Sequence, residues 1–231
     1  MVRVIVDKRS EKVFWIMDGN ERRIATKNLT PGKIVYKEKT LQLDKTEYRY
    51  WDPFRSKLAA ALINDLKYFP FSESSKVLYL GASTGTTVSH ISDILGEKGI
   101  VFAVEFAPRV ANEFIDRCAK FRRNVVTIVE DARRPDRYVG IFGKVDIVYC
   151  DIAQPNQTEI AIQNCRFYLK NGGYLFLIVK SRSIDSSKAP SRIFKEEEDK
   201  LKMGGFKLLQ TIVLSPFDKD HALIIVKIIR H

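Results

Sequence analysis

Residues 77–95 read VLYLGASTGTTVSHISDIL, a short apolar run, a loop with two glycines and an amphipathic segment. The apolar run predicts a buried strand, and from Val88 onward apolar side chains recur at helical spacing. Gly81 would allow a sharp turn, and Gly85 would remove a side chain where a ligand approaches the backbone. Doubly wound sheets bind ligands beyond the carboxyl ends of their strands, so this loop predicts a ligand crevice. A plain strand-to-helix turn is the alternative interpretation.

The same alternation of apolar runs and amphipathic segments continues after residue 95. The strands are expected at residues 77–80, 100–104, 125–129, 145–150, 174–179, 206–214 and 222–229. Nearly continuous apolar strands separated by helices predict a parallel sheet covered on both faces. Only residues 215–220 separate the last two strands, which should therefore form an antiparallel hairpin. A seven-strand sheet of this kind resembles the methyltransferase variant of the Rossmann arrangement, an α/β fold.

The first fifty residues follow a different pattern. Short β-type segments at 2–6, 13–17 and 22–26 are separated by turn signals such as Asp18-Gly19-Asn20, which predicts a small antiparallel sheet. The pattern changes near Trp51, and residues 56–66 have helical spacing. We therefore expect a small N-terminal β-rich domain over 1–52 and the main α/β domain over 53–231.

Composition narrows the functional classes. Lys and Arg outnumber Asp and Glu by 39 to 28, so the net charge is +11, which favours a polyanionic partner such as nucleic acid over a scattered basic surface. The three cysteines lack metal-ligand spacing and lie among apolar residues, which indicates a reducing compartment and no metal site. We find no signal-peptide pattern and no apolar run long enough for a membrane span, so we expect a cytoplasmic protein.

Acidic residues follow the next three strands of the predicted sheet. The second strand ends in Glu105-Phe106, the third in Glu130-Asp131-Ala132, and the fourth in Asp151-Ile152-Ala153-Gln154. A carboxylate after the second strand is where a doubly wound fold holds the two hydroxyls of a ribose. The alternative is a set of solvated acids. A nicotinamide dinucleotide is disfavoured, because the first loop lacks the third glycine of the dinucleotide fingerprint.

These strings, together with Arg49-Tyr50-Trp51-Asp52-Pro53-Phe54 at the expected domain junction, closely resemble fibrillarin in its short archaeal form. The resemblance extends over essentially the whole chain. It implies a catalytic subunit of a box C/D small ribonucleoprotein, which transfers a methyl group from S-adenosyl-L-methionine to ribose 2′-hydroxyls of rRNA or tRNA at guide-selected sites. The implied partners are a box C/D guide RNA, the target RNA, a Nop-type scaffold protein and a kink-turn-binding L7Ae-type protein.

The resemblance also assigns roles to residues. It places the cofactor contacts on Gly81, Ala82, Gly85, Thr86, Thr87, Glu105, Phe106, Asp131, Ala132, Asp151, Ile152, Ala153 and Gln154. It places the catalytic set of ribose 2′-O-methyltransferases on Lys57, Asp151, Lys180 and His221. Of these, Lys180 is the most telling, because it ends an apolar run and so lies at the carboxyl end of a strand. Each of three residues also has an alternative interpretation without the resemblance. Lys57 would be a solvated lysine in a first helical turn, and His221 would be a polar residue at the start of a strand. Phe106 would be an aromatic residue of the core.

Other functions remain open from the sequence. The chain could methylate a different RNA position or a protein glutamine, or serve as a non-catalytic structural subunit. The string after the fourth strand differs from the Asn/Asp-Pro-Pro-aromatic string of many base methylases, and the intact loop with Lys180 argues against a lost activity. Tyr48, Tyr50, Trp51 and Phe54 are candidate exposed contacts for a partner protein, with packing between the domains as the alternative.

Overall fold

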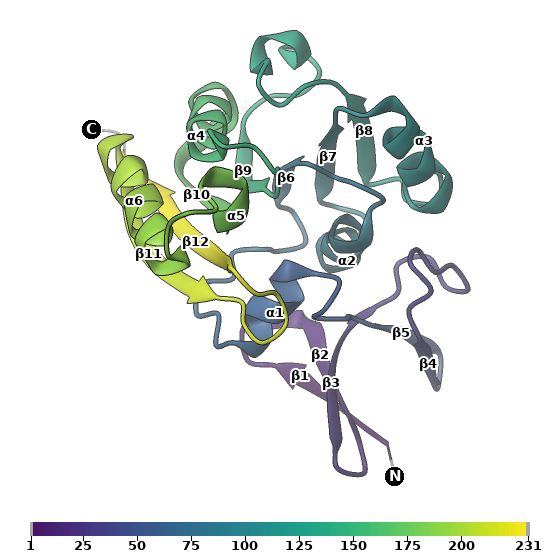
Figure 1. Ribbon diagram of the computed structural model, residues 1–231. Helices are drawn as coiled ribbons and strands as arrows, with labels where there is room; N and C mark the ends of the chain where they lie inside the picture. Colours follow the sequence, from purple (N-terminus) through teal and green to yellow (C-terminus); the bar gives the residue numbers. More distant parts are fainter. Residues whose placement is uncertain (1, 230–231) are drawn as a thin grey trace.

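A computed structural model, describing residues 2–229, contains one seven-stranded and one five-stranded sheet (Figure 1). The larger sheet has the order β11-β12-β10-β9-β6-β7-β8. Its strands are β6 (Lys76–Leu80), β7 (Ile100–Glu105), β8 (Val125–Val129), β9 (Val145–Cys150), β10 (Leu169–Lys180), β11 (Phe206–Val213) and β12 (His221–Ile228). Strands β6 to β10 are parallel, and β12 runs antiparallel to both β10 and β11. The predicted α/β sheet and its final hairpin are confirmed.

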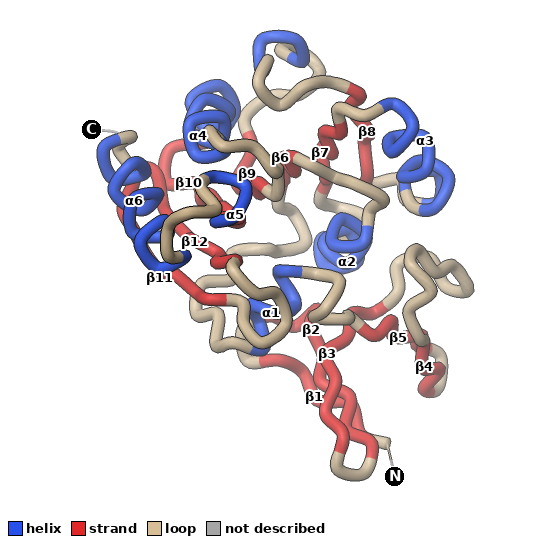
Figure 2. Tube along the Cα trace, viewed as in Figure 1, coloured by secondary structure: helices blue, strands red, loops and turns tan. Residues whose placement is uncertain are grey.

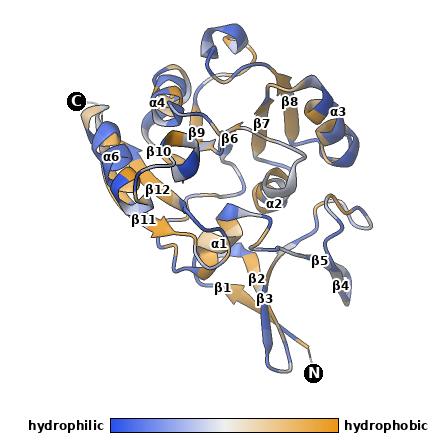
Figure 3. Cartoon of the chain, in the orientation of Figure 1, coloured by the Kyte–Doolittle hydropathy of each residue, from blue (hydrophilic) through white to orange (hydrophobic). Residues whose placement is uncertain are grey.

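Helices cover both faces of this sheet, as the apolar strands require. On one face, α1 (Lys57–Ile63), α2 (Thr86–Leu95) and α3 (Pro108–Arg117) pack against the odd-numbered side chains of β6. On the other face lie α4 (Gln157–Tyr168) and α6 (Pro190–Met203). Figure 3 shows apolar residues concentrated on the strands between these two layers. Short helical turns complete the domain at α5 (Ser181–Ile184), η1 (Ala119–Phe121) and η2 (Pro135–Tyr138).

The N-terminal sheet is antiparallel throughout, with the order β1-β2-β3-β5-β4. Strands β1 (Arg3–Asp7), β2 (Ser10–Asp18) and β3 (Glu21–Lys27) were predicted within a few residues. Strands β4 (Thr40–Leu43) and β5 (Thr46–Tyr50) were missed, because their sequences TLQL and TEYRY lack a run of apolar residues. The predicted helix over 56–66 ends earlier, at Ile63.

A buried polar network joins the two sheets; we call it the junction network. Arg49, which has no exposed surface, lies 2.6 Å from Glu38 and 2.8 Å from Asp93 of α2. Asp93 also pairs with Arg122 at 2.6 Å. Burial, and then the nearby Arg49 and Arg122, hold the pKa of His90 well below its ordinary value, so this side chain is neutral.

The junction also contains Trp51, whose ring stacks on His90 at 4.8 Å. Trp51 is only 1% exposed, so the prediction that it is an exposed partner contact is wrong. Phe54 is 70% exposed and stays a candidate for that role. One apolar cluster includes Trp15 and Trp51 together with side chains of α1 and α2. The division at residue 52 stays a prediction, and the two sheets share a core.

Among residues 2–229, no helix is both long and apolar enough to cross a membrane.

Candidate functional site

A cleft of about 360 Å³ lies at the carboxyl ends of the parallel strands, and the loops after β6, β7, β8 and β9 supply most of its lining residues. Figure 2 shows the strands in red and the loops in tan. The strand order reverses between β6 and β9, so this is the switch point at which doubly wound sheets bind ligands. Of the predicted site residues, those lining the cleft are Gly81, Glu105, Phe106, Asp131, Ala132, Asp151, Ile152, Ala153, Gln154 and Lys180. Four loops far apart in the sequence therefore converge on one cavity.

The two glycines of the loop after β6, Gly81 and Gly85, are required by close packing against neighbouring elements as well as by the cleft. Gly81 has φ +84°, and a Cβ there would lie 2.8 Å from the carbonyl oxygen of Asp151, so only glycine lets β6 and β9 approach. Gly85 has φ +92°, and a Cβ there would lie 2.6 Å from the ring of Phe114 in α3. The structure thus explains Gly85 by helix packing, and a cofactor contact for it stays a prediction.

Three further predicted contacts lie beside the cleft without lining it. Ala82 is buried, and Thr86 begins α2. The Thr87 hydroxyl is buried and lies 2.9 Å from the hydroxyl of Ser56, just before α1. This hydrogen bond ties the start of α1 to the start of α2. The cofactor roles of these three residues stay predictions.

Glu105 fixes one rim of the cleft. Its carboxylate accepts hydrogen bonds from the backbone N–H groups of Ser83, at 2.9 Å, and Ala107, at 3.0 Å. Each carboxylate oxygen keeps a second lone pair, so the group is held in place and can still accept a bond from a ligand hydroxyl. Next to it, Phe106 is 66% exposed, so its interpretation as a core aromatic is wrong. An exposed ring beside a carboxylate suits a flat heterocycle linked to a ribose.

Asp131, after the neighbouring strand β8, also lines the cleft and is bound by Arg133. The Arg133 guanidinium lies 2.6 Å from one oxygen, and its backbone N–H donates to the other at 2.9 Å. These hydrogen bonds hold the pKa of Asp131 below its ordinary value, so the carboxylate is ionised at neutral pH. A ligand amino group at this rim would share the carboxylate with Arg133.

Beside the cleft, five charged or polar side chains form one continuous series, which we call the ion-pair chain. Lys180 Nζ lies 2.8 Å from Asp151 Oδ1 and also donates to the Asp151 carbonyl oxygen at 3.0 Å. Lys57 Nζ lies 3.3 Å from Asp151 Oδ2 and 3.9 Å from Asp218 Oδ2. Asp218 Oδ1 in turn lies 2.7 Å from His221 Nδ1. The structure thus brings all four predicted catalytic residues together.

The fold explains how these residues meet. Asp151 follows β9, Lys180 ends β10, and His221 opens β12 directly opposite Lys180 in the antiparallel register. Lys57 is the first residue of α1. All four side chains are partly exposed, so they can reach a substrate while remaining ordered by one another.

The tautomer of the His221 ring follows from the groups that lie beside its Nδ1. Its Nδ1 lies 2.7 Å from the Lys219 carbonyl oxygen and 2.7 Å from the Asp218 carboxylate, and both of these groups only accept hydrogen bonds. Nδ1 must therefore carry a proton. In the neutral ring Nε2 is then an acceptor, available to a substrate hydroxyl.

Sequence reasoning missed Asp218. Asp218 lies in the loop between β11 and β12 and does not follow any of the parallel strands. Acidic site residues were expected only at the ends of those strands. Its only signal was a spacing of three residues from His221. Asp218 links His221 to Lys57, and without it the two ends of the ion-pair chain would be separate.

No group of three or more His, Cys, Asp or Glu side chains within residues 2–229 has an arrangement that could hold a metal ion. The ion-pair chain itself supplies two positioned lysines, two carboxylates and one imidazole. Such a set can orient a substrate hydroxyl and accept its proton.

The chain is similar to known proteins in both sequence and structure. The fibrillarin family model matches residues 4–230. A fibrillarin-like rRNA/tRNA 2′-O-methyltransferase of Methanocaldococcus jannaschii is 50% identical over 204 residues, which are 88% of each chain.

Two solved structures are similar along most of their length. A crystal structure of Aeropyrum pernix fibrillarin with natively bound S-adenosyl-L-methionine has a TM-score of 0.89 at 43% identity, covering 98% of this chain and 100% of that one. A crystal structure of a fibrillarin/Nop5p complex has a TM-score of 0.81 at 37% identity, covering 88% and 93%.

Proposed function

The chain belongs to the fibrillarin family, and from this premise we propose that it is the catalytic subunit of a box C/D small ribonucleoprotein. It transfers a methyl group from S-adenosyl-L-methionine to ribose 2′-hydroxyls of rRNA or tRNA, at positions that a guide RNA selects. The observation that carries the proposal is the ion-pair chain beside the cleft, since a ribose hydroxyl needs a proton acceptor and no base-specific chemistry.

The cleft residues fit the cofactor. The rim offers a fixed carboxylate for the ribose diol at Glu105, an exposed ring for the adenine at Phe106, and an ionised acceptor for its amino group at Asp131. The absence of a side chain at Gly81 keeps the bottom of the cleft open next to Asp151. The bound cofactor supplies an electrophilic methyl group on a sulfonium centre.

We assign proton acceptance to Lys180, oriented by Asp151. The Lys180 Nζ donates a hydrogen bond to the Asp151 carbonyl oxygen at 3.0 Å and forms an ion pair with Asp151 Oδ1 at 2.8 Å. An amine that has released its extra proton carries a lone pair, which a substrate hydroxyl can reach from the cleft that Lys180 lines. Asp151 therefore acts as a positioning residue for Lys180, and its own place in the cleft wall lets it steady the cofactor too.

Lys57 and His221 hold the target nucleotide on the other side of Asp151. Lys57, held near Asp151 and Asp218, offers its amine to a phosphate, and Asp218 contacts the His221 ring at Nδ1, which leaves Nε2 for the substrate. His221 Nε2 is the second candidate acceptor for the proton, because it is an acceptor in the neutral ring.

The partners follow from the family. The fibrillarin/Nop5p complex among the solved structures supports a Nop-type scaffold protein for this chain, and we extend the assembly to a guide RNA and a kink-turn-binding L7Ae-type protein. Phe54, exposed at the junction, is a candidate contact for the scaffold. Cys118 and Cys150 are free and buried, which suits the reducing cytoplasm that we propose as the site of action.

Glu105→Ala is expected to weaken cofactor binding. The change removes a charge-assisted hydrogen bond to the ribose, worth roughly 1.5 to 3 kcal/mol, or about 10- to 150-fold in affinity. Calorimetric titration of the isolated chain with S-adenosyl-L-methionine measures the effect. Glu113→Ala, which removes a surface carboxylate from α3, is the matched control and should bind normally. Unchanged affinity in Glu105→Ala would move the ribose contact to another residue.

The function itself is tested by a methyl-transfer assay with guide and target RNA, with and without the partner proteins. The complete assembly should methylate one ribose 2′-hydroxyl opposite the guide, and the pure chain should be far slower, because it presents no module that reads RNA sequence. Efficient and site-specific methylation by the pure chain would show that the guide complex is unnecessary. Methylation of a base or of a protein glutamine alone would overturn the assigned substrate.

A further inference from the structure

A second and larger cavity, a groove of about 1230 Å³, lies between the N-terminal sheet and α1 and shares no lining residue with the cofactor cleft. Its walls come from β1, β2 and β3, from segments 36–39 and 50–55, and from Phe217 in the loop before β12. The function proposed above makes no use of this groove.

Three arginines of the groove each lie over an aromatic ring. The distances from the guanidinium carbon to the ring centre are 3.7 Å for Arg22 and Trp15, 5.5 Å for Arg23 and Tyr50, and 5.6 Å for Arg55 and Tyr36. Trp15 and Tyr36 are less than a tenth exposed, so they support the guanidinium groups and are not platforms for bases. An arginine held on a ring loses less conformational entropy when it binds a phosphate.

The acidic residues of the groove compensate only part of this charge. Asp7 is bound by Arg9 and by the Trp15 indole N–H, each at 2.7 Å or less. Glu38 is occupied by Arg49 and by backbone N–H groups. Two further carboxylates remain against a larger number of exposed cations. These two are Asp52 and Asp65. Arg23 is paired with Glu21 on the surface, and the cations that remain are Arg22, Arg55, Lys8, Lys37 and Lys39.

The groove also reaches the ion-pair chain. The rings of Phe54 and Phe217 meet at 5.2 Å along its border. Arg55 precedes Lys57 by two residues, and Phe217 directly precedes Asp218. A chain of phosphates lying in the groove would therefore arrive beside the residues that handle the reacting ribose.

We propose that this groove binds the ribose-phosphate backbone of the RNA duplex that contains the target nucleotide. The inference rests on the function proposed above and adds where the substrate lies. Supported guanidinium groups, excess positive charge and continuity with the ion-pair chain match a polyanion that is held without reading its sequence. Exposed Ile5 and Val6 at one edge would suit a protein partner, which the experiment below distinguishes.

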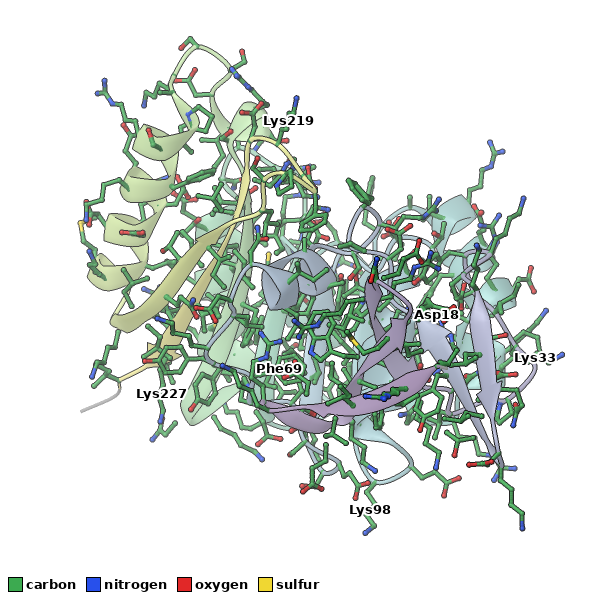
Figure 4. The ribbon with its side chains drawn as sticks, turned by 90° about the horizontal axis from the view of Figure 1, so that it is seen from below. Asp18, Lys33, Phe69, Lys98, Lys219 and Lys227 are labelled. Atoms are coloured by element: carbon green, nitrogen blue, oxygen red, sulfur yellow. The ribbon has the colours of Figure 1, made fainter. Side chains whose placement is uncertain are left out.

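The test compares two double variants of the full chain. Arg22→Gln with Arg55→Gln removes two supported charges from the groove. The control, Lys98→Gln with Lys227→Gln, removes two charges that do not line the groove, and both side chains are labelled in Figure 4. Lys227 also lies over a ring, that of Tyr174. Fluorescence anisotropy with a short labelled RNA duplex of arbitrary sequence gives the affinity at several salt concentrations.

The groove variant should bind the duplex about tenfold or more weakly, with the slope of log affinity against log salt reduced by about 2, while the control stays close to the parent. Equal loss in both variants, or no salt-dependent binding by the parent, overturns the proposal. The proposal is also overturned if the groove variant no longer binds the Nop-type scaffold in size-exclusion chromatography but keeps its RNA affinity. The groove would then be a binding site for protein. Calorimetry with S-adenosyl-L-methionine on every variant separates these outcomes from failure of the proposed methyltransferase function.

Discussion

Lys180→Ala should slow single-turnover methylation by the assembled complex by about 10² to 10⁴, the usual value of a general base. The reason is that Lys180 is the amine that the Asp151 carbonyl and carboxylate oxygens orient beside the cleft. Cofactor affinity and assembly should remain near normal, since the other residues lining the cleft are unchanged. Rapid-quench measurement with radiolabelled cofactor and a guide-target pair gives the rate directly.

The matched control lies on the same strand. Lys170, near the other end of β10, is paired with Asp146 at 2.6 Å, so Lys170→Ala also removes a lysine from an ion pair but far from the cleft. It should react at the parental rate. If Lys180→Ala turned over within a few-fold of the parent, the base assignment would be wrong. If His221→Ala then lost more of the methylation rate than Lys180→Ala, His221 Nε2 would be the group that accepts the proton of the ribose hydroxyl.

Arg49→Ala should lower the free energy of unfolding by about 3 to 5 kcal/mol, the usual cost of removing one partner from a buried ion pair. Arg49 is fully buried between Glu38 and Asp93, and its loss leaves Glu38 in the interior without its guanidinium partner. Because the junction network joins the N-terminal sheet to α2, the loss should affect the unfolding of the whole chain. Guanidinium denaturation followed by circular dichroism measures it.

Arg23→Ala provides the comparison, because Arg23 pairs with Glu21 on the surface, where both side chains are well exposed. Its effect on the free energy of unfolding should stay within about 1 kcal/mol. If Arg49→Ala cost no more than Arg23→Ala, the buried network would not hold the two sheets together.

The sequence was sufficient to predict the sheet and the cleft because both depend on local patterns. An apolar run predicts a buried strand, and the residue after it must lie at the sheet edge, so the amino-acid order alone places Glu105, Asp131, Asp151 and Lys180 at the cleft. The first three strands of the N-terminal sheet follow from the same reasoning.

The remaining features depend on contacts between distant residues. Asp218 matters only because the hairpin loop folds back toward α1, which no local pattern reports. Arg49 and Asp93 look like surface charges in the sequence, and their burial depends on partners about forty residues apart. Gly85 was interpreted from its loop alone, whereas its neighbour Phe114 lies in the next helix along the chain.

The order of strands in the larger sheet has a consequence for synthesis on the ribosome. Residues that line the cofactor cleft lie between 81 and 180, whereas Asp218 and His221 are made later. Strand β12 inserts between β10 and β11, so the apolar edge of β10 stays unpaired in the nascent chain until β12 emerges. A nascent chain can therefore complete its cofactor cleft before its ion-pair chain, and the interval before β12 docks is when it is most exposed to aggregation or in need of a chaperone.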